Sequence, residues 1–322
     1  GAHDSSDAII NDILAGKIRP RIKSGFAEYD ERSGGLPENG VMIIAATTSG
    51  GKSTIAMIIS KIMYLVNKMS VLRITLEMQE LQETQRLLSN LTGIPLRRFT
   101  QNKLTMPDKA LVKRKHKEYV AHGKEHGITY TTISPKGEMT IDGALRMARP
   151  FGHKVIVIDY LGLLDGTDGD DQWKALNAAA RVAKNYSRET GALVILLAQL
   201  DDATDKLRYA RGIKEHADVM WQWNYSKPEQ RESRVIPIQV SKDRDAELYT
   251  FDVGERFDVM NVTMNGANGQ VHKPDDSDDE EKPKKGGFGK GKGKDKDKKK
   301  GKKSKRKDED EDDDDTGKDA LS

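Results

Sequence analysis

The chain alternates short strand-like runs with longer stretches of helical periodicity. The apolar run before each turn predicts strands at Val41–Ala45, Val71–Thr75, His153–Asp159 and Ala192–Ala198, with a β-rich stretch at Ile128–Ile133. Later strands are expected at Val219–Trp223, Val235–Ser241 and Leu248–Val253. Apolar spacing predicts helices at Asp7–Lys17, Ile55–Met63, Leu81–Leu91, Met106–His126, Ile141–Ala148 and Asp171–Thr190.

This alternation predicts an α/β fold with a mostly parallel sheet and helices on both faces. The unbroken apolar content of the run that ends at Asp159 is typical of a central strand buried on both sides. Pro237 cannot donate to a strand ladder, so its strand is expected at a sheet edge or bulge.

Composition divides the chain into three parts. Residues 1–22 hold a tag-like Gly-Ala-His start and a short helix, which either packs on its own domain or docks on a neighbouring subunit. Residues 23–270 carry the α/β pattern. Residues 271–322 form a lysine-rich run followed by an acidic run, too polar to bury a core, so we predict a disordered tail. That tail is either a solubilising segment or an electrostatic arm for nucleic acid or protein.

The cysteine content bears on the cellular compartment, whereas the net charge gives little information about binding partners. The 322 residues include no cysteine, which fits a reducing cytoplasm, and no apolar run is long enough to cross a membrane. Although 33% of the residues are charged, the net charge is only +3, so the total says little about binding.

The segment ATTSGGKST, residues 46–54, stands between a predicted strand and a predicted helix, which is the layout of a P-loop. Its glycines allow backbone N–H groups to surround phosphate oxygens, and the helix N-terminus favours negative charge. Alanine replaces the first glycine of the motif at Ala46. The predicted nucleotide-binding residues are Thr48, Ser49, Gly50, Gly51, Lys52, Ser53 and Thr54.

Within this loop, Lys52 is expected to reach the β- and γ-phosphates and Ser53 to hold Mg²⁺. Three further polar residues end or follow predicted strands, and such strand ends meet at one edge of a parallel sheet. Asp159 is expected to hold Mg²⁺ through water, Glu77 to orient or deprotonate the attacking water, and Gln199 to sense the γ-phosphate.

Several segments together resemble the DnaB-type replicative helicases, a family that includes phage primase–helicases. They are Leu76-Glu-Met78, Arg86-Leu-Leu-Ser89, the strand that continues into Tyr160-Leu-Gly-Leu163, Leu197-Ala-Gln-Leu200, Gly212–Asp218 and Val240-Ser-Lys-Asp-Arg244. The resemblance covers roughly 24–262 and implies a RecA-like motor domain, without the N-terminal collar or primase domain usual in that family. The chain is therefore expected to be a motor-domain fragment or a minimal phage version.

The resemblance implies an ATP-hydrolysing helicase that forms a homo-oligomeric ring, usually a hexamer, and moves 5′ to 3′ on single-stranded DNA. It implies ATP at subunit interfaces, Gln199 as a coupling residue, and Lys242 and Arg244 as a finger that reaches the neighbouring subunit's ATP. Such a finger would neutralise charge that develops on the γ-phosphoryl group. A primase, a polymerase or a single-strand-binding protein are candidate partners.

Two loops are candidates for DNA contact. The loop after Asp159 is acidic and a poor phosphate binder, whereas Lys206, Arg208 and Arg211 follow Gln199 and could track a DNA backbone. Two other functions remain open on the same residues: a recombinase-like filament ATPase, and a slowly hydrolysing nucleotide switch. The Tyr160-Leu161 pair and the Lys-x-Arg spacing favour the helicase.

Overall fold

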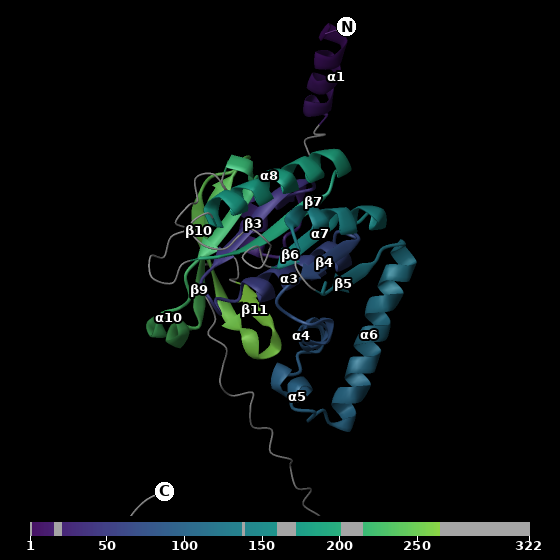
Figure 1. The fold of residues 1–322 in the computed structure, drawn as a ribbon, viewed down its shortest axis with the longest axis vertical. Coiled ribbons are helices and arrows are strands. Elements are labelled where there is room, and N and C mark those ends of the chain that lie inside the picture. The colour runs from purple at the N-terminus through teal and green to yellow at the C-terminus, as the bar shows by residue number, and fades with distance from the viewer. Residues whose placement is uncertain (1, 16–20, 137–138, 160–171, 201–214, 265–322) are drawn as a thin grey trace, which may run out of the picture. The chain divides into compact units, whose positions relative to one another are not determined.

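The computed structural model describes residues 2–15, 21–136, 139–159, 172–200 and 215–264 (Figure 1). Its main feature is a nine-stranded sheet in the order β11-β10-β9-β8-β3-β7-β6-β4-β5. The strands are β3 Gly40–Ala46, β4 Val71–Thr75, β5 Tyr130–Ile133, β6 Val155–Asp159, β7 Leu193–Gln199, β8 Val219–Trp223, β9 Val235–Asp243, β10 Tyr249–Arg256 and β11 Asn261–Met264. A separate ribbon pairs β1 Arg21–Ile22 with β2 Leu36–Pro37.

The six strands from β8 to β5 run parallel, and β9, β10 and β11 extend the sheet antiparallel. The helices are α1 Ala2–Leu14, α2 Ala27–Ser33, α3 Lys52–Leu65, α4 Glu80–Thr92, α5 Leu96–Thr100, α6 Met106–His126, α7 Ile141–Ala148, α8 Gln172–Thr190 and α10 Pro228–Ser233. Two short 3-10 turns follow α7 and β10, namely η1 Arg149–Phe151 and η4 Phe257–Val259. The predicted α/β class with a mostly parallel sheet is confirmed.

The sheet is buried on both faces because its central strands are apolar at every position. In β3, Met42 and Ile44 face a cluster with α3, while Val41 and Ile43 face a second cluster with α7 and α8. Side chains alternate between the two faces of a strand, so a continuous apolar run requires a helix layer on each side. Figure 1 shows this sandwich, with α7 and α8 covering one face and α3 the other.

The strand order brings the carboxyl ends of four interior strands side by side. β3, β7, β6 and β4 are consecutive neighbours, although they lie far apart in sequence. Because all four run parallel, their carboxyl ends meet on the same side. The P-loop follows β3, so the residues that end β7, β6 and β4 come to lie beside it.

The position predicted for Pro237 was wrong in one respect. Its strand, β9, is interior, because β8 pairs on one side and β10 on the other. The ladder with β8 spans only Val219–Asp243 to Gln222–Gln239, so Pro237 lies beyond it and removes no bond from it. The β-bulge in that ladder lies at Met220/Trp221 instead.

Helix α1 forms, but it begins and ends earlier than the periodicity predicts. Its apolar side chains Ile9, Ile10, Ile13 and Leu14 are 51–79% exposed. This exposure disfavours packing of α1 on its own domain.

Across the described ranges of the chain, none of the helices has both the length and the apolar content needed to span a bilayer.

Candidate nucleotide site

The loop between β3 and α3 has the backbone shape of a phosphate-binding turn. Ser49 and Gly51 both have positive φ, at 57° and 84°, and the Gly50 N–H donates to the Thr47 carbonyl at 3.0 Å. A Cβ on Gly51 would lie 2.0 Å from the ring of Phe257, so only glycine fits there. Gly51 is also the N-cap of α3, so the helix N-terminus opens onto the loop.

Strand β8 and the segment after it hold the loop from the side. The Trp223 indole N–H donates to the Gly50 carbonyl at 2.7 Å, and the Tyr225 amide donates to the Thr47 hydroxyl at 3.2 Å. Trp223 and Tyr225 are buried, so these bonds are protected from water. The loop is therefore fixed in shape before any ligand binds, which lowers the entropy cost of binding.

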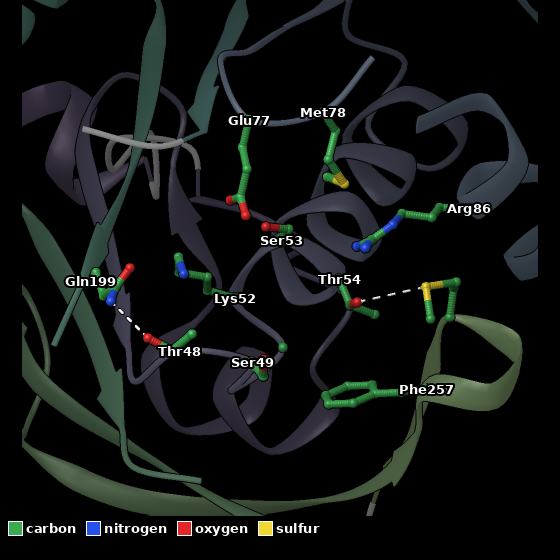
Figure 2. A pocket seen from close by; sticks show the side chains of 12 residues that line it. Thr48, Ser49, Lys52, Ser53, Thr54, Glu77, Met78, Arg86, Gln199 and Phe257 are labelled. Carbon is green, nitrogen blue, oxygen red and sulfur yellow. Dashed lines mark hydrogen bonds between the residues drawn. The ribbon is translucent and has the colours of Figure 1, made fainter. Parts of the chain in front are cut away.

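A cavity of about 310 Å³ opens over this loop (Figure 2). Lys52, Ser53 and Glu77 point into it, with Gln199 and Thr48 on one side and Arg86, Thr54 and Phe257 on the other. Its lining residues are Thr48, Ser49, Gly51, Lys52, Ser53, Thr54, Glu77, Met78, Arg86, Gln199, Phe257 and Met260.

Most residues predicted for nucleotide chemistry thus meet in one cavity. Lys52 is the first residue of α3 and is only 7% exposed. Glu77 is exposed and lies two residues beyond β4, while Gln199 ends β7 and donates from Nε2 to the Thr48 hydroxyl at 2.7 Å. Gly50 belongs to the same loop but does not line the cavity, because its carbonyl is turned toward Trp223.

Asp159 ends β6 beneath the cavity and is 1% exposed. Burial raises the pKa of its carboxyl, while Arg73, the Ser53 hydroxyl and Lys52 act in the opposite direction. Neither carboxylate oxygen has a hydrogen bond of good geometry to any group in the described part of the chain. Two unsatisfied buried oxygens beside a serine hydroxyl fit a hydrated Mg²⁺ ion, which prefers oxygen ligands and keeps several waters.

A buried ion pair supports β6 and β4 from below. Arg73 of β4 contacts Glu83 of α4 at 3.0 Å and donates to the Ser60 hydroxyl of α3 at 3.2 Å. Burial acts to lower the pKa of the Arg73 guanidinium, but the charge of Glu83, with smaller contributions from Tyr130 and Asp159, outweighs it and raises the pKa. Arg73 and Asp159 lie on the same face of neighbouring strands, since Arg73 pairs with Val157 two positions before Asp159.

Lys242 and Arg244 lie away from this cavity. Arg244 follows β9, and its backbone N–H donates to the carbonyl of Asp218, the residue just before β8. Asp218 in turn binds the amide of Val41 at the start of β3. The pair therefore lies at the amino ends of the parallel strands, whereas the P-loop lies at their carboxyl ends. The distance between them is roughly 20 Å along β3 at 3.3 Å per residue.

The Arg244 side chain is engaged within its own chain. Its Nε lies 3.0 Å from Asp218, which also accepts two hydrogen bonds from Lys184 of α8. Burial lowers the pKa of the Lys242 ammonium, and the positive charge of Arg244 adds to this effect. Arg244 remains 46% exposed, so its guanidinium is accessible from outside the chain.

Sequence reasoning missed the far wall of the cavity. Phe257 and Met260 come from η4 and the residue that follows it, where Asn90 of α4 fixes the turn by donating to the Met260 carbonyl at 2.7 Å. The Thr54 hydroxyl contacts Met260 Sδ at 3.9 Å. Arg86 was noted only as part of a motif, yet it lines the cavity. Its helical position one and a half turns into α4 was the only available signal.

Some predicted residues lie outside the described ranges. Lys206, Arg208 and Arg211 fall in 201–214, the acidic loop falls in 160–171, and the charged tail falls in 265–322.

The fold and this cavity define a P-loop NTPase with a RecA-like architecture. The model of the DnaB-like helicase C terminal domain matches residues 21–257, about three quarters of the chain, so the protein belongs to that family. Among curated proteins, the replicative DNA helicase DnaC of Bacillus subtilis is 25% identical over 248 residues, covering 71% of this chain and 53% of the relative. The replicative DNA helicase DnaB of Geobacillus stearothermophilus is 25% identical over 247 residues with the same coverage.

Two solved structures have the same fold. The ATPase domain of G40P superposes with a TM-score of 0.70 at 19% identity, covering 83% of this chain and 99% of that one. A DnaB-like replicative helicase, whose structure is described with its interactions with primase, superposes with a TM-score of 0.66 at 18% identity, covering 82% and 66%. The chain spans about half the length of the curated relatives it matches.

Proposed function

We propose that this chain is the motor of an ATP-driven replicative DNA helicase, which moves 5′ to 3′ on single-stranded DNA as a homo-oligomeric ring, with six subunits as the expected number. Family membership and the names of the relatives support this function over a recombinase-like filament ATPase or a nucleotide switch. A role in replication implies the cytoplasm as the location and makes primase, polymerase and single-strand-binding protein candidate partners.

The observation that carries the proposal is the distribution of polar and charged groups over the two ends of the parallel strands. The carboxyl ends present Lys52, Ser53 and Glu77 in a single cavity. The amino ends present Lys242 and Arg244, which cannot reach the cavity of their own chain. A ring that places Lys242 and Arg244 of one subunit against the cavity of the next would complete each site.

In the proposed site, the residues Thr48–Thr54 surround the phosphates, and Lys52 binds the β- and γ-phosphates of ATP. Ser53 and Asp159 hold Mg²⁺, the latter through water. Glu77 positions and deprotonates the attacking water, and Gln199 links the γ-phosphate to the loop that follows β7. The Mg²⁺ ion supplies charge neutralisation on the phosphates.

Two residues outside the sequence prediction extend this assignment. Arg86 lies in the cavity and adds a permanent positive charge on the side of Thr54. The Phe257 ring covers the P-loop at Gly51 and offers an aromatic face to the base of the nucleotide.

The exposed apolar side of α1 fits a linker helix that docks on the neighbouring subunit.

The test is Lys52→Ala, assayed for ATP hydrolysis and for unwinding of a forked duplex with a 5′ tail. Both activities should fall to background, because the phosphates lose their main counter-charge. The matched control is Lys154→Ala, which removes an exposed lysine just before β6, at the end of that strand away from the cavity. Retained hydrolysis in a folded Lys52→Ala protein would refute the site, and hydrolysis without unwinding by the wild type would refute the helicase.

A further inference from the structure

Helix α6 carries a row of lysines along its exposed side. Lys109, Lys113, Lys117 and Lys124, which we call the lysine stripe, are all exposed. At about 100° per residue they lie within about 80° of one another around the helix axis, and at 1.5 Å per residue they extend over about 22 Å. His116 and Val120 lie on the same face, and no acidic residue of α6 does.

The opposite side of α6 is anchored to the domain. The Tyr119 ring packs 4.6 Å from that of Tyr64 on α3 and 5.8 Å from that of Tyr130 on β5. Tyr64 donates to the Tyr119 carbonyl at 3.0 Å, and its own carbonyl lies 3.1 Å from the His122 ring nitrogen. A Cβ on Gly123 would lie 2.1 Å from the Tyr64 hydroxyl, so the approach is close.

Both helix ends are also fixed. Thr105 and Asp108 form a capping box, and Gly127 ends the helix in the left-handed conformation. The lysine stripe is therefore held rigidly on the outer surface, beyond β5 at the end of the sheet (Figure 1).

Three other cations in this region contact carboxylates, unlike the described lysines of the stripe. Arg98 binds Asp108 at 3.1 Å, Lys115 binds Glu118 at 2.8 Å, and Arg114 lies 3.9 Å from Glu118. Within the ranges that the structure describes, no carboxylate contacts a lysine of the stripe. Like charges in a row, spaced along the axis by about 6 Å between the first three lysines and about 10 Å before the fourth, repel one another, and an extended polyanion would relieve this repulsion.

We propose that the lysine stripe binds the phosphate backbone of DNA on the outside of the motor domain, at a site separate from the nucleotide cavity. The inference rests on the proposed helicase function. A DNA backbone is a regular line of negative charge, and lysine ammonium groups bind phosphates as point charges without sequence preference. The acidic run at residues 308–315 is a weaker candidate, because the lysine-rich run just before it in the sequence competes for its charge.

The test compares two double variants of the full chain that lose the same charge. Lys113→Gln with Lys117→Gln removes half of the stripe, while Arg114→Gln with Lys115→Gln removes two cations outside the stripe that both contact Glu118. Lysine and glutamine have similar helix propensity, so both proteins should fold, as circular dichroism would check. Fluorescence anisotropy with a labelled forked duplex, read over a series of salt concentrations, gives the affinity and its salt dependence.

We expect the stripe variant to bind the fork more weakly and to flatten the slope of log affinity against log salt by about 1.4–1.8, because each lost phosphate contact contributes about 0.7–0.9. Its ATPase activity without DNA should match that of the wild type. The control variant should keep the wild-type slope. Equal slopes in both variants would overturn the proposal.

Two further results separate this inference from others. If the wild type binds no DNA at all, the proposed helicase function itself fails. A third protein, cut after Gln270, tests the acidic tail: if the cut wild type and the cut stripe variant bind the fork equally, the stripe contacts only the tail and the DNA assignment is wrong. If the cut stripe variant still binds the fork more weakly than the cut wild type, the stripe contacts DNA whether or not the tail also reaches it.

Discussion

Gln199, the last residue of β7, donates a 2.7 Å hydrogen bond to the hydroxyl of Thr48 in the P-loop. Its neighbour Leu200 donates to the carbonyl of Ala46, the last residue of β3. The P-loop and the segment that begins at residue 201 are thus joined through adjacent strand ends. A change at the phosphates can therefore reach the region that the sequence predicts to contact DNA.

The first prediction follows from this link. Gln199→Ala should leave the fold and nucleotide affinity nearly unchanged, since the side chain is exposed, but should abolish the stimulation of ATP hydrolysis by single-stranded DNA. The measurement is the ratio of ATPase rates with and without DNA. Gln222→Ala is the matched control, because Gln222 of β8 also bonds through its amide, to Gln239, outside the cavity. An unchanged ratio in Gln199→Ala would exclude a coupling role.

The second prediction concerns Glu77, which points into the cavity from the turn after β4. Glu77→Gln keeps the shape of the side chain but removes its basicity, so hydrolysis should slow by about 10²–10⁴-fold while nucleotide binding persists. Binding of a fluorescent ATP analogue and steady-state hydrolysis measure the two effects. Glu80→Gln, an exposed change three residues later outside the cavity, should do neither. Loss of binding in Glu77→Gln would instead indicate a structural or metal-binding role.

The third prediction tests the buried pair of Arg73 and Glu83, whose side chains are 2% and 5% exposed. Glu83→Gln leaves a buried guanidinium without its counter-charge, which costs about 3–5 kcal/mol of unfolding free energy. Urea denaturation measures the loss, and Glu125→Gln on the exposed surface of α6 should cost almost nothing. The double variant Arg73→Met with Glu83→Leu should recover most of the stability. A fully additive double variant would show that the two residues are not coupled.

The sequence predicted the parts of the site that are encoded locally. The P-loop needs only a strand, a turn and a helix in succession, so ATTSGGKST was sufficient to place Lys52 and Ser53. The burial of Asp159 followed from its apolar strand. The order β3-β7-β6-β4 then brings Glu77 and Gln199 to the same end of the sheet, because the carboxyl ends of parallel strands lie side by side.

The parts that depend on distant packing could not be predicted. Phe257 reaches the P-loop only because β10 and β11 extend the sheet and η4 turns back toward α3, and no local pattern signals that turn. The buried Arg73 interrupts a strand pattern and looks like a surface residue until Glu83 is found opposite it. The contact between Arg244 and Asp218 likewise joins residues whose proximity comes from the β8–β9 pairing.

The last prediction concerns Arg244, which lies at the amino ends of the parallel strands, away from its own cavity, and contacts Asp218 at 3.0 Å. If it serves the neighbouring subunit, Arg244→Ala should bind nucleotide almost normally yet hydrolyse it poorly. Arg146→Ala, which removes another exposed arginine from an ion pair with a carboxylate, should hydrolyse normally.

Mixing experiments distinguish action on the neighbour from action within the chain. Lys52→Ala subunits keep the arginine but lose the phosphate site, and Arg244→Ala subunits have the reverse defect. A mixed ring contains some interfaces where an intact site faces an intact arginine, so activity should partly return, provided that gel filtration shows mixed assemblies. If none returns, a single wild-type subunit in an Arg244→Ala ring decides the matter. Hydrolysis at the cavity of that subunit would mean that Arg244 acts within its own chain, because the neighbouring subunit that should supply the arginine has none to offer.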